Sequence, residues 1–468
     1  MKKISFLICI LLCLGIGTGK AQYSVLLNFN STNGANPRGS LVLSGDKLYG
    51  MTYNGGAHND GCVFSLNTVS NVYTDLLDFN GTNGANPAGS LILSGRMLYG
   101  MTSYGLSSAG NIFSIDTNGN NYKDLFDFSG GLNGANPYGS LTLSGGKLYG
   151  MTRDGGRFET GNIFSIDTNG NGYKELNSFQ DYRSDDGQYP FGSLILSGDV
   201  LYGMTYRGGA VYAGIIFSID TSGHNYRDML DFDGNTNSVN PYGSLIVSGN
   251  KLYGTTTNGG VGYGCIFSVD TNGSRYKNLF QFNGTNGANP EGSLILSNGI
   301  LCGMTSKGGA HDSGCIFSID TNGNGYTDLF DFNGSNGTNP EADLTLSGNT
   351  FYGMTNGGGS NNNGVIFSLK VTGLGINNLT ANPTSINVYP NPSNGEFTIQ
   401  AKSEELRGNS MVEVYNVLGE KVYDATLQPQ TPEGALINIS NQPNGIYLYR
   451  LVGSSGELIG EGKVIIQK

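Results

Sequence analysis

Tryptophan is absent from the 468-residue chain, histidine occurs only three times and charged residues make up only 13% of it. The lack of tryptophan excludes enzymes built on Trp-ending Asp boxes, and three histidines are too few for a multi-histidine copper centre. The sequence also contains no Gly-x-Ser-x-Gly nucleophile elbow, no His-Glu-x-x-His zinc motif and no Gly-Lys-Ser/Thr phosphate loop. We therefore assign no catalytic residue, no metal ligand and no cofactor from the sequence.

Long apolar runs are also scarce, and the one that stands out lies at the N-terminus. Residues 1–21 combine a basic start, an apolar core and a small-residue end at Ala21. This pattern predicts a secretory signal peptide cleaved after Ala21, and no later run approaches the ~20 apolar residues of a membrane helix. The segment holds three of the 25 basic residues, so the mature charge is 22 minus 36, or −14. Such a charge argues against nucleic acid as a partner.

Glycine, by contrast, is abundant at 76 residues and recurs at fixed offsets. Variants of Leu-Tyr-Gly-Met-Thr place it every 49 to 53 residues, at Gly50, Gly100, Gly150, Gly203, Gly254, Gly303 and Gly353. Each unit has four short apolar runs, which in the second unit span residues 89–93, 97–102, 111–116 and 122–128. Four strands in each of seven units predict an all-β fold, a seven-bladed β-propeller over residues 22–370.

The two ends of the repeat region indicate how the ring closes. Residues 23–30 match the fourth run of a unit, whereas the last unit stops after its third run, at Leu369. We therefore expect the N-terminal strand to complete the last blade and to close the ring. The loops between second and third strands, and between each fourth strand and the next unit, are long and emerge on one face. This long-loop face is where we expect a ligand to bind.

Four cysteines remain after the signal peptide: Cys62, Cys265, Cys302 and Cys315. Three of them share the register Gly-Cys-(Val/Ile)-Phe, where other units carry Asn, Ile or Val. Exchange with Ile and Val predicts buried thiols that pack as small apolar residues, rather than disulfides.

The C-terminal segment breaks the repeat. Residues 371–385 are predicted to be a linker, and period-two alternation in residues 386–468 predicts a small β-sandwich. Its blocks Tyr-Pro-Asn-Pro-x-x-Gly (389–395), Val-Tyr-Asn-x-x-Gly (414–419) and Gly-x-Tyr (445–447) resemble the type A sorting domain of type IX secretion. The resemblance implies a Gram-negative bacterium, recognition by the translocon, and attachment to surface lipopolysaccharide or release. The alternative is an unrelated sugar-binding sandwich.

The repeats themselves resemble the GloVer tandem repeat family. Tyr-Gly-Met-Thr and Gly-x-Ile-Phe-Ser carry the match, from about residue 23 to 370. The resemblance implies a surface-associated, propeller-like protein and leaves its activity open.

Aromatic and basic residues on the long loops are the candidate ligand-binding residues, since tyrosine rings stack on sugars or peptides while their hydroxyls bond to the ligand. They are Tyr53, His58, Tyr104, Arg153, Arg157, Tyr206, Arg207, Tyr212, Tyr263, Lys307 and His311. Tyr138, Phe191 and Tyr242, each directly after a loop proline, extend the set. Packing of these rings against neighbouring loops is the alternative.

We therefore predict an exported surface binding or adhesion module with a glycan or protein ligand. One alternative is an extracellular polysaccharide-degrading enzyme whose carboxylates meet at the channel mouth, namely Asp154, Glu159, Asp185, Asp186, Glu291 and Glu341. Another is a structural surface component. The run Asp167-Thr-Asn-Gly-Asn-Gly, echoed from Asp320, resembles the start of a calcium loop but lacks the twelfth-position Glu, which favours a hairpin turn and leaves weak calcium binding open.

Overall fold

The computed structural model describes residues 21–180, 186–234, 238–371, 387–400, 410–416, 421–427, 435–452 and 458–468. The chain forms two compact units, Met1–Ile376 and Asn377–Lys468. The expected signal peptide, apart from Ala21, and the expected linker, apart from Val371, lie outside the described residues. Among the helices that the structure describes, none has the length and apolar character needed to cross a membrane.

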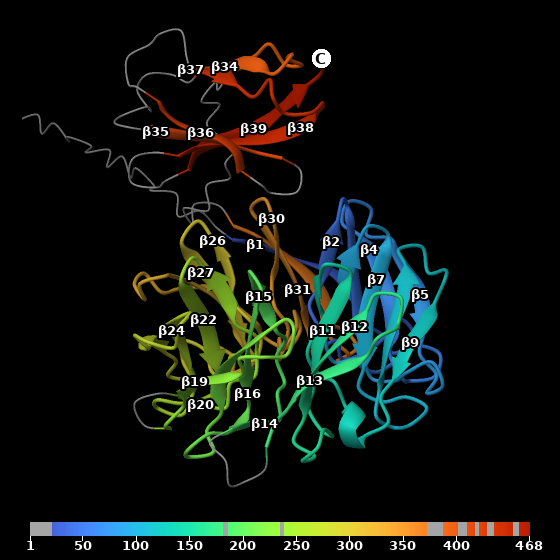
Figure 1. Ribbon diagram of the computed structural model, residues 1–468. Helices are drawn as coiled ribbons and strands as arrows, with labels where there is room; N and C mark the ends of the chain where they lie inside the picture. Colours follow the sequence, from blue (N-terminus) through green and yellow to red (C-terminus); the bar gives the residue numbers. More distant parts are fainter. Residues whose placement is uncertain are drawn as a thin grey trace, which may run out of the picture. The chain divides into compact units, whose positions relative to one another are not determined.

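The first unit consists of four-stranded antiparallel sheets, one for each repeat (Figure 1). The first sheet contains β2 (Val42–Ser44), β3 (Lys47–Thr52), β4 (Cys62–Asn67) and β5 (Tyr73–Asp78); the second β6 (Ile92–Ser94), β7 (Met97–Thr102), β8 (Asn111–Asp116) and β9 (Lys123–Asp127); the third β10 (Thr142–Ser144), β11 (Lys147–Thr152), β12 (Asn162–Asp167) and β13 (Lys174–Ser178). The fourth contains β15 (Ile195–Ser197), β16 (Val200–Thr205), β18 (Ile215–Asp220) and β19 (Arg227–Asp231); the fifth β21 (Ile246–Ser248), β22 (Lys251–Thr256), β24 (Cys265–Asp270) and β25 (Lys277–Gln281); the sixth β26 (Ile295–Ser297), β27 (Ile300–Thr305), β28 (Cys315–Asp320) and β29 (Thr327–Asp331). This arrangement confirms the all-β prediction.

The seventh sheet joins the two ends of the repeat region. It contains β30 (Thr345–Ser347), β31 (Thr350–Thr355), β32 (Val365–Lys370) and the N-terminal strand β1 (Gln22–Asn28). β1 pairs with β32 from Gln22 opposite Lys370 to Asn28 opposite Val365. The N-terminal strand therefore occupies the place that a fourth strand takes in the other sheets.

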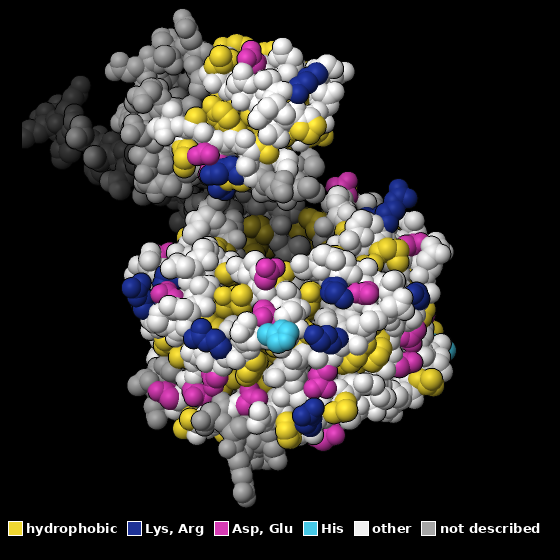
Figure 2. Space-filling model, viewed as in Figure 1, with side chains coloured by type: hydrophobic (Ala, Val, Ile, Leu, Met, Phe, Trp, Pro, Cys, Tyr) yellow, Lys and Arg dark blue, Asp and Glu magenta, His cyan; other side chains and the backbone are white. Residues whose placement is uncertain are grey.

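The third strand of each sheet is buried on both sides. Ile112, Phe113 and Ile115 of β8 are all inaccessible to solvent. Both faces of a strand are buried when its sheet lies between two neighbouring sheets, which explains why these strands read as continuous apolar runs. On the outer side of the unit, Figure 2 shows charged side chains scattered among small hydrophobic areas.

The first strand of each repeat is shorter than the sequence predicts. In the second repeat we expected it over residues 89–93, but β6 begins at Ile92. Gly89 and Ser90 are used differently: the Ser90 N–H donates to Ser140 Oγ of the next repeat at 2.8 Å, and the Ser90 Oγ accepts from the Ser40 N–H at 2.7 Å. These residues connect repeats instead of extending a strand.

The same bond recurs in every repeat, and we call the residues that make it the serine belt. The Ser140 N–H donates to Ser193 (2.7 Å), that of Ser193 to Ser244 (2.8 Å), that of Ser244 to Ser293 (2.9 Å), that of Ser293 to Asp343 Oδ1 (2.5 Å) and that of Asp343 to Ser40 (2.8 Å). The chain of hydrogen bonds thus returns to the residue from which it starts.

The two kinds of long loop lie together, as the sequence predicts. β14 (Gly187–Gln188), which precedes the fourth sheet, pairs with β17 (Arg207–Gly208) in the loop after β16. β20 (Ser238–Val239) pairs likewise with β23 (Asn258–Gly259), and isolated bridges such as Ala135 to Asp154 replace these pairs elsewhere. A 3-10 turn, η1 (Gly131–Asn133), lies in the same kind of loop.

The four cysteines among the described residues, Cys62, Cys265, Cys302 and Cys315, are free and buried, which confirms the packing prediction. Cys62 Sγ lies 3.3 Å from Thr52 Oγ1. Burial raises the pKa of the Cys62 thiol to about 11. The thiol therefore stays protonated and packs as an apolar group.

The second unit is a two-sheet β structure. One sheet contains β33 (Asn387–Tyr389), β34 (Glu396–Gln400) and β37 (Ala435–Asn438); the other contains β36 (Lys421–Leu427), β35 (Ser410–Tyr415), β38 (Gly445–Val452) and β39 (Leu458–Ile466). Phe397 and Ile437 of the first sheet and Val412 and Leu451 of the second belong to one buried cluster. Packing of two sheets over a shared core is the arrangement that the alternating pattern predicts.

Candidate functional site

A cavity in the first unit is lined by the same three-residue segment of every repeat, which begins directly after the loop proline and ends at the serine belt. We call its first positions the post-proline ring: Arg38, Ala88, Tyr138, Phe191, Tyr242, Glu291 and Glu341. The residue before each proline has a positive φ, which is 51° at Asn136. Asparagine, which precedes the proline in six of the seven repeats, tolerates this conformation, so the Asn-Pro pair turns these six loops into the cavity in the same way.

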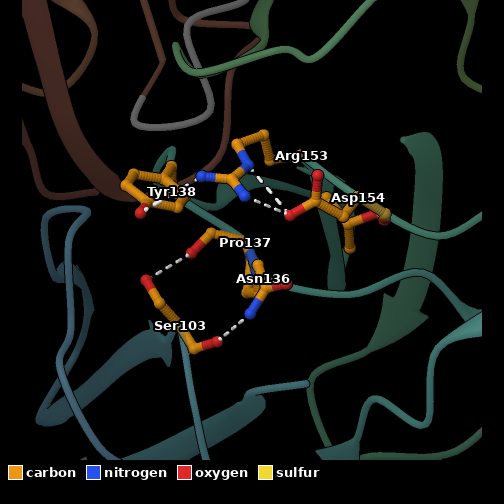
Figure 3. A network of polar contacts seen from close by, with 7 residues as sticks. Ser103, Asn136, Pro137, Tyr138, Arg153 and Asp154 are labelled. Carbon is orange, nitrogen blue, oxygen red and sulfur yellow. Dashed lines mark hydrogen bonds and ion pairs between the residues drawn. The ribbon is translucent and has the colours of Figure 1, made fainter. Parts of the chain in front are cut away.

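Neighbouring loops hold this turn in place. The Asn136 side chain donates to the Ser103 carbonyl at 2.8 Å, and the Ser103 hydroxyl donates to the Pro137 carbonyl at 3.0 Å (Figure 3). Since these bonds run from one repeat to the next, they fix the position of Tyr138 in the ring.

One side of the post-proline ring is aromatic. The Phe191 and Tyr242 rings are stacked, with centroids 4.6 Å apart, and the Tyr138 ring meets Phe191 edge-on at 5.1 Å. The Tyr206 ring, from the loop after β16, also meets Phe191 edge-on at 5.2 Å. Both geometries are favourable for aromatic pairs, so the rings form a continuous wall.

The other side of the ring is charged. Arg38 Nε lies 3.7 Å from Glu341 Oε2, and the Arg38 guanidinium lies 3.8 Å from the centroid of the Tyr53 ring. Burial and the neighbouring charge of Glu291 raise the pKa of Glu341 to about 7, although Arg38 opposes the shift. Burial also raises the pKa of Glu291, against the hydrogen bond from Ser306 and the charge of Lys307.

Replacing Glu341 with glutamine should stabilise the first unit at neutral and alkaline pH. The ordinary pKa of this carboxyl is 4.5, so between pH 4.5 and 7 the folded chain binds more protons than the unfolded chain and stability falls as the pH rises. Glu341→Gln removes this loss, and we expect a gain of about 1 to 2 kcal/mol at pH 8 and none at pH 4. Urea unfolding at both pH values tests this, with the exposed Glu159→Gln as control. An equal effect at both pH values would contradict the prediction.

A second cavity, which we call the Arg207 pocket, lies on the third and fourth repeats. It is lined by Arg153, Asp154, Tyr189, Phe191, Tyr206 and Arg207, and it has about 430 Å³ of empty volume, part of which is open solvent. Phe191 belongs to both cavities, so the pocket adjoins the aromatic side of the post-proline ring. Most ligand sites combine apolar walls with a few polar groups in this manner.

Within the Arg207 pocket, Arg153 and Asp154 form an ion pair. Arg153 Nε and Nη2 lie 2.9 and 2.6 Å from Asp154 Oδ2, and Nη1 donates to the Tyr138 hydroxyl at 3.4 Å (Figure 3). Burial alone would lower the pKa of Arg153, but the hydrogen bonds and charge of the Asp154 carboxylate outweigh it and raise that pKa. The guanidinium is thereby held against the aromatic wall in one orientation.

The structure brings together seven of the residues predicted from the sequence. Tyr53 contacts Arg38, Tyr104 lies close to Tyr53 and Arg153, Tyr212 packs against Arg207, and Lys307 lies close to Glu291. Arg153, Tyr206 and Arg207 line the Arg207 pocket. Their roles in binding a ligand stay predictions.

Four other predicted residues lie away from both cavities. His58, Arg157, Tyr263 and His311 are exposed on loops and line neither cavity. The Tyr263 ring lies against Gly284, which corresponds to the alternative of packing on a neighbouring loop.

Only some of the carboxylates named for the enzyme alternative line a cavity. Glu291 and Glu341 line the first cavity, and Asp154 lines the Arg207 pocket. Glu159 is exposed and lines neither cavity, Asp186 accepts hydrogen bonds from the Tyr226 hydroxyl and Gly187 N–H, and Asp185 lies outside the described residues.

The runs that resemble calcium loops are hairpin turns. Asp320 Oδ1 accepts the backbone N–H groups of Asn322 and Asn324 at 2.8 and 2.9 Å, and these bonds lower the pKa of Asp320. Lys147 Nζ lies 2.6 Å from Asp167 Oδ1. The carboxylates thus stabilise the turns, and among the described residues no group of three or more His, Cys, Asp or Glu side chains is placed to hold a metal ion.

Sequence reasoning missed Arg38, Ala88 and Tyr189. Arg38 and Ala88 occupy the post-proline register that singled out Tyr138, Phe191 and Tyr242, so the register itself was the available signal. Tyr189 stands where six repeats have asparagine before the proline, and its φ is 54°. Bulky residues rarely adopt this conformation, and such outliers concentrate at functional sites.

Comparison with solved structures supports the fold. An oligogalacturonate lyase in complex with manganese matches with a TM-score of 0.50 and 12% identity over 77% of this chain and 95% of that chain. A fungal alcohol oxidase in complex with copper (TM-score 0.47, 11% identity, 96% of this chain and 100% of that chain) and a puromycin-hydrolyzing peptidase of Mycobacterium tuberculosis (0.46, 13%, 72% and 52%) are less similar. At such identities the first match shows a likeness of fold alone. No curated protein matches the chain.

Comparison with family models identifies both units. Residues 387–467 match the secretion system C-terminal sorting domain, which confirms the resemblance to type IX sorting tails. The protein is therefore exported to the cell surface or the extracellular space of a Bacteroidetes-type Gram-negative bacterium, and its tail interacts with the type IX machinery. The Gloeobacter/Verrucomicrobia repeat model matches residues 15–211 and 181–367. The chain thus belongs to the family of proteins built from the Gloeobacter/Verrucomicrobia repeat.

Proposed function

We propose that the first unit is a closed seven-bladed β-propeller that serves as an extracellular binding or adhesion module. Two observations support closure: β1 supplies the fourth strand of the seventh sheet, and the serine belt returns from Asp343 to Ser40. Closure leaves no open sheet edge between first and last repeats, so a surface protein gains protection from aggregation.

The observation that carries the binding role is the unequal composition of the post-proline ring. The repeats are alike in their strands, yet the ring residues range from arginine through alanine and three aromatic residues to two glutamates. Packing alone would be satisfied by one residue type repeated seven times. A rigid scaffold with different side chains around one opening is the usual arrangement of a binding surface.

A glycan is the ligand class that the aromatic wall favours. The faces and edges of Phe191, Tyr206 and Tyr242 offer flat apolar surface next to hydroxyl groups, a combination suited to sugar rings. A protein ligand is the alternative within the same proposal. Attachment of the exported protein to surface lipopolysaccharide is a separate expectation that rests on the sorting-domain resemblance.

An extracellular polysaccharide-degrading enzyme is the second candidate function. It rests on Glu291 and Glu341, two carboxyls in one cavity whose pKa values are both raised by burial. A proton donor near neutral pH and a carboxylate are what glycoside hydrolysis requires. Mass spectrometry of each bound polysaccharide after incubation distinguishes cleavage from binding.

Replacing Tyr206 with alanine should weaken glycan binding about tenfold, because the substitution removes one side of the aromatic wall. A glycan array and polysaccharide pull-down with the mature chain, residues 22–468, identify the ligand, and titration then gives the affinity. Tyr263→Ala is the matched control, since Tyr263 is an exposed loop tyrosine outside both cavities. Equal losses in the two variants would show that the Arg207 pocket is not the binding site.

A further inference from the structure

Arg207 differs from the other arginines around the two cavities in having no carboxylate partner. Arg38 lies beside Glu341 and Arg153 beside Asp154, whereas Arg207 forms no ion pair within the part of the chain that the structure describes. Its guanidinium is exposed and lies 5.8 and 5.5 Å from the centroids of the Tyr206 and Tyr212 rings. Contact with two rings orients a guanidinium without neutralising its charge.

A hydrogen-bond acceptor lines the same pocket. Both Arg153 nitrogens in the ion pair with Asp154 bond to Oδ2. Among the described residues, no hydrogen bond to Asp154 Oδ1 is formed, so this oxygen keeps its capacity to accept. The pocket therefore pairs a cationic donor with an anionic acceptor.

The backbone of Tyr189 supplies an independent sign of specialisation. The six equivalent asparagines adopt its left-handed conformation at little cost, and Asn136, for example, uses its side chain to bond the preceding loop. Tyr189 accepts the strained φ of 54°, and its hydroxyl lies close to Arg207, Asp154 and Tyr212. The strained residue thus adds a hydroxyl group to the pocket that holds the cation and the acceptor.

We infer that the Arg207 pocket binds an acidic saccharide, with the sugar carboxylate on Arg207, ring hydroxyls on Asp154 Oδ1 and Tyr189, and the apolar face of the ring on Phe191 and Tyr206. Arginine suits this role because its planar fork bonds both oxygens of a carboxylate. The inference rests on the proposed binding function and narrows its ligand class.

The acceptor favours a saccharide over an acidic peptide. A peptide side chain or C-terminus would use Arg207 and the aromatic wall but would bring its carboxylates close to Asp154. A sugar acid carries hydroxyl donors next to its carboxylate, so it satisfies the cation and the acceptor together. The net negative charge of the chain does not prevent an anionic sugar from binding at this site. Salt at physiological ionic strength screens charges that lie more than about 8 Å away.

Calorimetric titration of the mature chain at 150 mM salt tests the inference. The probes are alginate oligosaccharides, neutral dextran oligosaccharides of the same length, dextran sulfate oligosaccharides and an aspartate-rich peptide. We expect alginate oligosaccharides to bind best and Arg207→Gln to weaken them about tenfold or more. Arg96→Gln removes the same charge from a short turn between β6 and β7 and should leave the affinity within about twofold.

Circular dichroism and the unfolding transition of both variants establish that the fold is kept. One outcome would overturn the acidic ligand class and preserve the proposed function. In this outcome neutral dextran binds as tightly as alginate, Arg207→Gln has no effect on the affinity, and Tyr206→Ala lowers it. If the sulfated or the peptide probe binds more tightly than alginate and its affinity depends on Arg207, the assignment of a carboxylated saccharide as the ligand would be overturned. Binding of alginate that responds equally to Arg207→Gln and Arg96→Gln would overturn the assignment of the site. No binding of any probe would overturn the inference, and a silent glycan array would then count against the proposed function as well.

Discussion

Replacing Phe29 with alanine should lower the free energy of unfolding of the repeat unit by about 3 to 5 kcal/mol. Phe29 is fully buried, and its ring meets Phe64 edge-on at 5.5 Å. Six further pairs have the same geometry: Phe79–Phe113 (5.3 Å), Phe128–Phe164 (5.4 Å), Phe179–Phe217 (5.3 Å), Phe232–Phe267 (5.5 Å), Phe282–Phe317 (5.3 Å) and Phe332–Phe367 (5.4 Å). The substitution therefore removes one of seven contacts between adjacent repeats and leaves a cavity.

Phe179→Ala is the matched control, because Phe179 makes the same contact between two adjacent repeats in the middle of the chain. In a closed ring the two substitutions cost the same, since the junction between the last and first repeats is then like every other. Urea unfolding followed by tyrosine fluorescence gives both free energies. A cost below about 1 kcal/mol for Phe29→Ala beside a full cost for Phe179→Ala would contradict closure by the N-terminal strand.

The regular parts of the fold were predictable because the same local sequence pattern recurs in all seven repeats. The match of residues 23–30 to the fourth run of a unit indicated that they act as a fourth strand, and β1 pairs with β32 accordingly. The exchange of Cys62 and Cys315 with Ile and Val in other repeats indicated buried thiols, which the structure contains. In both cases the evidence lay in comparison between repeats.

Features that depend on contacts between repeats could not be predicted. Gly89 and Ser90 read as part of a strand, yet Ser90 belongs to the serine belt, because a local pattern does not show which neighbour a backbone N–H will bond. In the same way the sequence predicts that the long loops lie on one face but does not show which of their residues line the cavities. The histidines therefore looked equivalent to Tyr53, although His58 and His311 lie on exposed loop segments away from the cavities.

Tyr189 shows a different limit of prediction from the sequence. Its neighbours in sequence are irregular, and the repeat alignment breaks over residues 181–189, so the match between Tyr189 and the asparagines of other repeats was obscured. The backbone conformation, with φ at 54°, reveals the correspondence. The backbone geometry was therefore needed to align Tyr189 with the asparagines of the other repeats.

Replacing Gly150 with alanine should destabilise the repeat unit by about 2 to 4 kcal/mol, although the change adds a single methyl group. A Cβ at this position would lie 2.5 Å from Phe164 Cζ, 2.9 Å from its Cε1 and 3.2 Å from Leu141 Cδ2. Phe164 cannot move aside freely, because it is fully buried and meets Phe128 edge-on. The glycine of Tyr-Gly-Met-Thr is thus required by the ring packed against it, and its φ is not positive.

Gly105→Ala is the control, because the nearest atom to an added Cβ there lies 3.7 Å away and φ is again not positive. This variant should be neutral or more stable by up to about 1 kcal/mol, since alanine restricts the unfolded chain. The double variant Gly150→Ala with Phe164→Leu should cost less than the sum of its parts, because the smaller side chain relieves the overlap. Strict additivity of the two substitutions would show that Gly150 is needed for a reason other than the Phe164 ring.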